Sequence, residues 1–98
     1  MSVLMTLRVR GDGTRLEGLD SEVFRSVVER AKEHGLISHR FWGSSSEILV
    51  VDEWPDEGSF QKFFDASPEV PEMMQRAGVS DQPEITFWRP LATGDQVG

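Results

Sequence analysis

The segment LISHRFWGSSSEILVVDEW, residues 36–54, decides the fold of this 98-residue chain. Residues 36–42 and 47–54 are rich in β-branched and aromatic side chains, which favour β-strands. The Gly-Ser-Ser-Ser sequence between them, residues 43–46, has the composition of a turn. We therefore predict a β-hairpin over this segment.

A strand and a helix precede the hairpin. Residues Val3–Arg10 alternate with the two-residue period of a strand, and Gly11-Asp12-Gly13 ends it with turn chemistry. Asp20 or Ser21 can cap a helix that ends at Gly35, where a left-handed residue stops it. Its apolar positions fall on one face at helical spacing. They are Val23, Phe24, Val27, Val28 and Ala31.

A second helical region and a last strand follow the hairpin. Pro55 predicts the start of a helix, which Pro68 interrupts, and a shorter helical piece then ends at Gly78. Residues 84–89 alternate again as a strand that Pro90 closes. The apolar positions of the two helical pieces are Phe60, Phe63 and Phe64, then Val70, Met73, Met74 and Ala77.

The order strand, helix, strand, strand, helix, strand predicts an α+β fold. Right-handed crossovers with helices on one face make it a ferredoxin-like βαββαβ arrangement, with a four-stranded antiparallel sheet in the order 4-1-3-2. We expect residues 1–90 to form this single domain and residues 91–98 to form a C-terminal tail without periodicity.

The sheet is apolar on both faces. A hairpin that is symmetric about its turn sets His39 opposite Val50 and Ile37 opposite Asp52, so Asp52 lies diagonally across from His39. The helix-covered face then holds Ile37, His39, Phe41, Ile48, Val50, Asp52, Trp54, Val3, Met5, Leu7, Val9, Ile85 and Phe87. The opposite face holds Leu36, Ser38, Arg40, Trp42, Leu49, Val51, Glu53, Leu4, Thr6, Arg8, Thr86 and Trp88. Such a face is too apolar to stay in water, which predicts a homodimer through sheet-to-sheet packing; the alternative is a monomer whose tail covers the sheet.

Composition excludes several classes of protein. The net charge of −7 disfavours a nucleic-acid partner. The chain has no cysteine, no apolar run long enough for a membrane span and no signal-like start, so we expect a cytoplasmic protein without a membrane partner. Two histidines without cysteine form a poor metal-ligand set, and Gly11-Asp12-Gly13 lacks the rest of a phosphate loop, so no metal and no cofactor is predicted.

Three segments carry a resemblance to a known family: AKEHGLISHRFW, ILVVDEWPDEGSFQKFF and EVPEMMQRAGV. They and the strand order resemble the dimeric α/β-barrel superfamily, and most closely its small proteins of the antibiotic-biosynthesis-monooxygenase type. The resemblance implies a homodimer whose facing sheets form a barrel, with a pocket between sheet and helices in each subunit. Members include cofactor-independent monooxygenases, haem-degrading monooxygenases, muconolactone isomerases and proteins without an established activity.

The candidate catalytic pair is His39 with Asp52, because a carboxylate that holds an imidazole in one tautomer makes it a better general base. Such a base would take a proton from a phenol or enol, and the resulting anion could pass an electron to dioxygen. The alternative is a buried polar pair whose members satisfy each other. The candidate substrate-binding residues for a small aromatic ligand are Trp54, Phe60, Phe64, Met73 and Phe87. Aromatic residues at this spacing more often form an ordinary core.

Three functions therefore remain open. The first is an oxidoreductase that resembles cofactor-independent monooxygenases and acts on a small aromatic or enolic compound. The second is a non-catalytic ligand-binding or stress-related dimeric module. The third is a structural dimer. An open pocket that reaches His39 would favour the first two, and a filled interior would favour the third.

Overall fold

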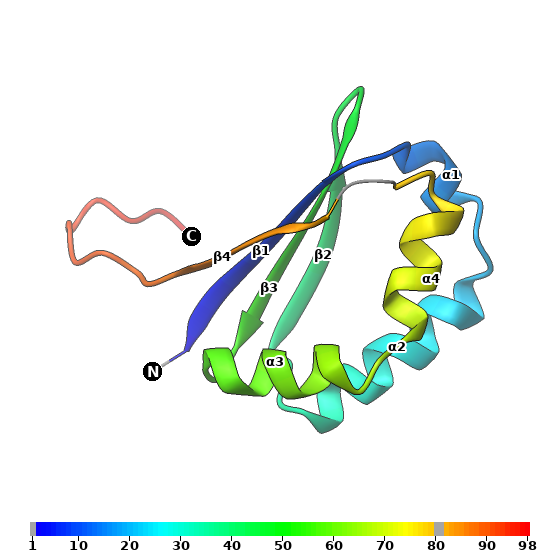
Figure 1. Ribbon diagram of the computed structural model, residues 1–98. Coiled ribbons are helices and arrows are strands. Elements are labelled where there is room, and N and C mark those ends of the chain that lie inside the picture. The colour runs from blue at the N-terminus through cyan, green and yellow to red at the C-terminus, as the bar shows by residue number, and fades with distance from the viewer. Residues whose placement is uncertain (1, 80–81) are drawn as a thin grey trace.

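The computed structural model describes residues 2–79 and 82–98, and it confirms the predicted α+β ferredoxin-like fold (Figure 1). Four strands form one antiparallel sheet in the order β2-β3-β1-β4, as the sequence predicts. The strands are β1 (Val3–Arg10), β2 (Ser38–Gly43), β3 (Glu47–Trp54) and β4 (Glu84–Trp88). The helices are α1 (Gly13–Glu17), α2 (Ser21–Glu33), α3 (Glu57–Asp65) and α4 (Glu69–Arg76).

Local signals explain where the helices begin and end. Asp20 caps α2 by accepting the backbone N–H of Glu22, as predicted. The cap of α3 is Asp56 rather than Pro55, and its carboxylate accepts a hydrogen bond from the backbone N–H of Ser59. This hydrogen bond lowers the pKa of the Asp56 carboxyl. Gly35 follows α2 with a φ of 101°, a left-handed conformation that glycine adopts without strain.

The short helix α1 is absent from the sequence prediction. We interpreted residues 11–13 as a turn only, but the Asp12 side chain also accepts the backbone N–H of Thr14 and caps a single helical turn. This turn buries Leu16 in the core. The backbone N–H of Asp12 donates to the carbonyl of Ala77, which attaches the start of α1 to the end of α4.

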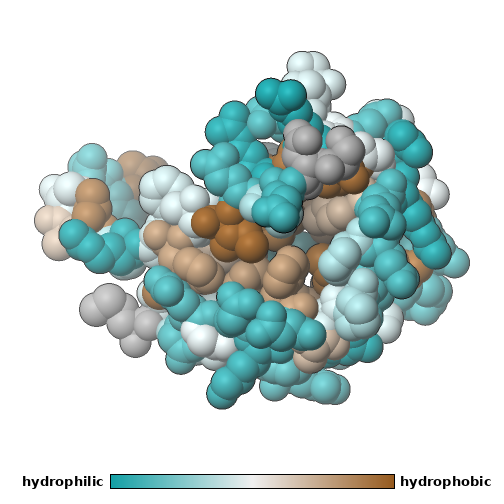
Figure 2. All heavy atoms as spheres, in the orientation of Figure 1, coloured by the Kyte–Doolittle hydropathy of each residue, from teal (hydrophilic) through white to brown (hydrophobic). Residues whose placement is uncertain are grey.

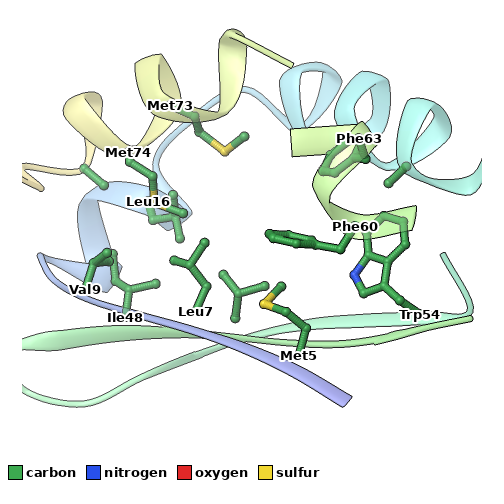
Figure 3. Close-up of a cluster of buried hydrophobic side chains, with 13 residues drawn as sticks. Met5, Leu7, Val9, Leu16, Ile48, Trp54, Phe60, Phe63, Met73 and Met74 are labelled. Atoms are coloured by element: carbon green, nitrogen blue, oxygen red, sulfur yellow. The ribbon is translucent and has the colours of Figure 1, made fainter. Parts of the chain in front are cut away.

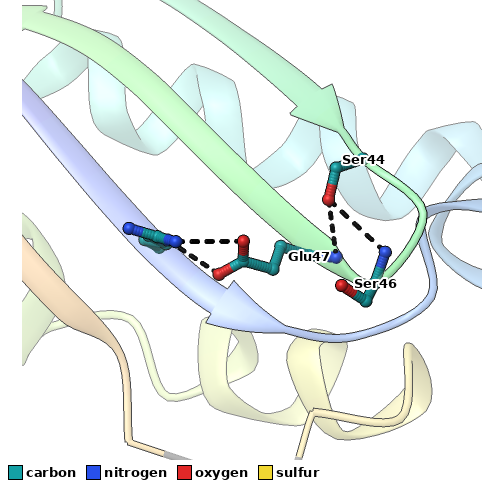
Figure 4. Close-up of polar contacts among 4 residues, drawn as sticks. Ser44, Ser46 and Glu47 are labelled. Carbon is teal, nitrogen blue, oxygen red and sulfur yellow. Dashed lines mark hydrogen bonds and ion pairs between the residues drawn. The ribbon is translucent and has the colours of Figure 1, made fainter.

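The hairpin register differs from the prediction by two residues. His39 pairs directly with Asp52, and Trp42 with Leu49, because the turn is centred between Ser45 and Ser46, one residue later than predicted. The hydroxyl of Ser44 accepts the backbone N–H groups of Ser46 and Glu47 and closes this turn (Figure 4). An even shift keeps each side chain on its predicted face, so the face assignment of β2 and β3 survives the error.

The residues just before β2 are an exception to that assignment. Leu36 packs against the core and Ile37 is 55% exposed, the reverse of the prediction. The backbone N–H of Leu36 donates to the carbonyl of Ala31, so Leu36 still belongs to the end of α2. The alternation of the strand therefore begins only at Ser38.

All four helices cover one face of the sheet, and the core lies between the two layers (Figure 1, Figure 3). Trp54 is fully buried there, with its ring edge-on to Phe60 and tilted against Phe63 of α3. The other buried apolar side chains are Met5, Leu7, Val9, Leu16, Ala31, Ile48, Val50, Phe60, Phe63, Met73, Met74 and Ala77.

Within residues 2–79 and 82–98, no helix covers the other face of the sheet (Figure 1). Leu4, Trp42 and Trp88 are 40%, 54% and 52% exposed on it. The guanidinium of Arg8 forms two hydrogen bonds with the carboxylate of Glu47 on the same face, which lowers the pKa of Glu47. Residues 91–98 contain no helix or strand and extend away from the sheet (Figure 1).

Replacement of Trp54 tests its place in the core. We expect Trp54→Ala to lower the free energy of unfolding by about 3–5 kcal/mol, because it leaves a large cavity under α3. Urea denaturation measures the loss. Leu91→Ala, at a residue that is 66% exposed, is the control and should change stability by less than about 0.5 kcal/mol. Equal effects of the two substitutions would contradict this assignment of the core.

Candidate active site

His39 and Asp52 face the helices from the middle of neighbouring strands. The ring Nδ1 of His39 lies 2.7 Å from Oδ1 of Asp52. Asp52 is buried at 5% exposure, whereas the His39 side chain keeps 24% of its surface exposed. The direct cross-strand pairing brings the two closer than the predicted diagonal contact would.

Trp54 completes a network of three side chains. It lies two residues after Asp52 on β3, so both side chains point to the same face. The indole Nε1–H donates to Oδ2 of Asp52 over 3.2 Å. Each carboxylate oxygen thus has its own donor, which offsets part of the cost of burying this group.

The network determines which nitrogen of His39 can act as a base. An ionised carboxylate can only accept hydrogen bonds, so Nδ1 carries the hydrogen that points to Asp52. The lone pair of Nε2 is then free to accept a proton. Phe41 packs edge-on against the imidazole at 4.8 Å between ring centroids and restricts its rotation.

A cavity of about 60 Å³ lies between the sheet and the helices, and His39 and Asp52 contribute to its wall. The other lining residues are apolar. The strands and the residue before β2 contribute Met5, Leu7, Leu36, Phe41 and Val50. The helices contribute Phe24, Val27, Val28, Ala31, Phe60, Phe63, Phe64, Val70, Met73 and Met74. The site is therefore a narrow apolar slot with one polar end.

The predicted substrate-binding residues divide into two groups. Phe60, Phe64 and Met73 line the cavity. Trp54 and Phe87 lie outside its wall, Trp54 behind Asp52 and Phe87 edge-on to Phe60 at 5.7 Å. The contribution of α2 to the cavity wall was not predicted. The apolar stripe of this helix, which includes Phe24 and Val27, could have indicated it.

An ion pair links the two helices beside this cavity. The guanidinium of Arg30 on α2 contacts the carboxylate of Glu69 at the start of α4. Ala31 and Val70, the residues next to this pair in the sequence, line the cavity. The pair therefore joins α2 and α4 beside the cavity.

A metal-ligand cluster and a membrane-spanning helix are both absent from the described part of the chain. Within residues 2–79 and 82–98, no three histidine, aspartate or glutamate side chains converge as a set of metal ligands. Over the same ranges, no helix has the length and apolar character to cross a membrane.

Comparison with solved structures finds the same architecture elsewhere. A monooxygenase, ActVA-Orf6 of Streptomyces coelicolor, in complex with nanaomycin D, has a TM-score of 0.69 and 18% identity, over 94% of this chain and 89% of that chain. SnoaB, a cofactor-independent oxygenase from Streptomyces nogalater, has a TM-score of 0.61 and 14% identity, over 97% of each chain. A dimeric ferredoxin-like protein from an uncultured marine organism has a TM-score of 0.61 and 17% identity, over 93% and 89%.

This chain has the same ferredoxin-like fold as these three proteins. The predicted resemblance to the antibiotic-biosynthesis-monooxygenase type is confirmed at that level. The sequence itself matches no protein-family model and no curated protein. At such low identities the likeness establishes the architecture, and function has to be argued from the side chains of the site.

The substitution Asp52→Asn tests the network. The Trp54 N–H will hold the amide oxygen, so the amide NH₂ will face His39 and force Nδ1 to accept. We expect the ring hydrogen of His39 to move to Nε2, which ¹⁵N NMR of the histidine ring detects.

Two controls belong to this experiment. In the double variant Asp52→Asn/Trp54→Phe the side-chain amide can rotate by 180° and present its oxygen to His39. The Nδ1–H tautomer of His39 should therefore return in part. His34, whose Nδ1 lies 3.0 Å from the carbonyl of Arg30, should keep Nδ1–H in every variant. An unchanged His39 tautomer in Asp52→Asn would show that the network does not control it.

Proposed function

We propose that this protein is a cofactor-independent monooxygenase that acts on a small aromatic or enolic compound. The observation that carries the proposal is the His39–Asp52 pair at the polar end of an apolar cavity. Among solved structures with this fold, one is described as a cofactor-independent oxygenase and another as a monooxygenase, which supports the choice of reaction.

In the proposed reaction Nε2 of His39 takes the proton of a phenolic or enolic hydroxyl. The electron-rich anion then reduces dioxygen, so the substrate itself supplies the electrons. For the probe 1-naphthol, one molecule of dioxygen gives 1,4-naphthoquinone and one molecule of water, which balances atoms and electrons. Asp52 stabilises the imidazolium that forms, and the apolar walls limit its contact with water.

Oxygen consumption with 1-naphthol tests the proposal. We expect the wild type to consume one dioxygen per quinone formed, and His39→Ala to be slower by about 10²–10⁴-fold, the usual contribution of a general base. His34→Ala is the matched control and should keep the wild-type rate, because His34 is not part of the cavity wall. Unchanged uptake in His39→Ala would exclude His39 as the base.

A non-catalytic binding module is the second candidate. The fully paired carboxylate of Asp52 favours it over the enzyme, whereas the small cavity volume favours a structural dimer. Saturable binding of 1-naphthol without oxygen uptake by the wild type would support this reading over the enzyme. If 1-naphthol does not bind either, the structural dimer becomes the better interpretation.

We further propose that a second copy of the chain covers the open face of the sheet. The exposed Leu4, Trp42 and Trp88 lie on this face, and a solved structure with the same fold is described as dimeric. A two-fold axis would bring two copies of this face together and remove their apolar surface from water.

The substitution Trp42→Asp tests the dimer. A carboxylate in place of this indole should convert the protein to monomers, because it removes apolar surface from the proposed interface and would have to lose its water on association. Analytical ultracentrifugation measures the result at micromolar concentration. Arg25→Asp, on the solvent side of α2, is the control and should leave the dimer intact. A wild type that sediments as a monomer would refute the interface.

A further inference from the structure

A second depression lies beside the candidate active site, with a volume of about 240 Å³. It opens between α4 and the sheet, where Figure 2 shows apolar side chains in a hollow between hydrophilic ones. Leu7, Phe64, Val70 and Met74 line both this outer groove and the inner cavity. The two spaces are therefore neighbours that share one wall.

The inner cavity is too small for an aromatic ring as it stands. An engineered protein cavity that binds benzene measures about 150 Å³, more than twice the volume found here. Only water or a single small group fits beside His39 at the observed volume of about 60 Å³. If the shared wall opened, the combined space would reach the lower end of the range of ligand pockets, about 300 Å³.

Met74 is the part of this wall that can move. Leu7 is held in the middle of β1, and Phe64 stacks on Phe60 with ring centroids 5.4 Å apart. Val70 is β-branched and therefore stiff. Met74 has an unbranched side chain that changes shape at low cost, and it points from α4 toward the sheet (Figure 3).

We propose that Met74 is a movable partition that determines ligand size, and that the outer groove is a second subsite. The ligand is a hydroxyarene, as the proposed function implies, with several fused rings that fill both spaces. Its hydroxyl group enters the inner cavity and reaches His39, and its apolar body lies in the outer groove. The exposed Gln75 at the groove wall leaves the outer end of the ligand in a polar setting. The placement of the hydroxyl group rests on the proposed function, whereas the partition itself does not.

Binding of two probes of different length tests the partition. Phenol has one ring, and 9-phenanthrol has three fused rings. Affinities are measured by calorimetry without oxygen, so that no turnover interferes. We expect Met74→Ala to bind 9-phenanthrol at least about tenfold more tightly than the wild type, because the ligand no longer has to displace the side chain. The affinity for phenol should change much less, because its single ring fits in the outer groove without opening the wall.

Met73→Ala is the matched control. Met73 lines the inner cavity but not the outer groove, so its loss enlarges the cavity without joining the two spaces. It should not favour 9-phenanthrol over phenol. Gln75→Glu places a charge at the groove without touching the cavity, and should weaken the binding of both probes severalfold.

Three outcomes would overturn the proposal. The first is an equal effect of Met74→Ala on both probes, and the second is the same preference in Met73→Ala. The third is no binding of 9-phenanthrol to either the wild type or Met74→Ala. Failure of the proposed function looks different, because 9-phenanthrol would then bind with the expected preference but no oxygen would be consumed.

Discussion

The buried carboxylate of Asp52 is the constraint around which the site is built. Asp52 is 5% exposed, and burial of a carboxylate in an apolar layer is costly unless hydrogen-bond donors reach its oxygens. Two aromatic heterocycles provide them, His39 from the neighbouring strand and Trp54 from the same strand. Both contacts depend on the hairpin register, because a shift of one residue would turn Asp52 to the other face. The strand pairing, the packing of Trp54 under α3 and the orientation of the imidazole are therefore parts of one arrangement.

The architecture could be predicted because its signals are local. Alternation identified the strands, Asp20 marked the start of α2, and Gly35 and Gly78 marked helix ends with left-handed backbone, at φ values of 101° and 81°. The order of these elements then left few topologies. The errors are also local. The hairpin turn is centred one residue later than symmetry about residues 43–46 implied, and a hydrogen bond to Ala31 keeps Leu36 with the preceding helix.

The candidate site could be predicted only in part. His39 and Asp52 were identified because the hairpin contains one histidine and one aspartate, and they lie on paired strands. The hydrogen bond from Trp54 could not be predicted, since an apolar aromatic position in a strand gives no sign of what its N–H contacts. Nor could the cavity volume, which depends on how Phe60, Phe64 and the methionines of α4 fill the space between the layers. Packing at that level is decided by side-chain shape rather than by pattern.

The contact between Arg30 and Glu69 has a consequence for how fast a molecule can enter. These side chains are 36% and 30% exposed, so dissolved ions reach them and weaken their attraction. The helices they connect, α2 and α4, both line the inner cavity. We therefore expect ionic strength to change how fast a guest enters and leaves the inner cavity, even when the guest carries no charge, because it weakens the link between these two helices.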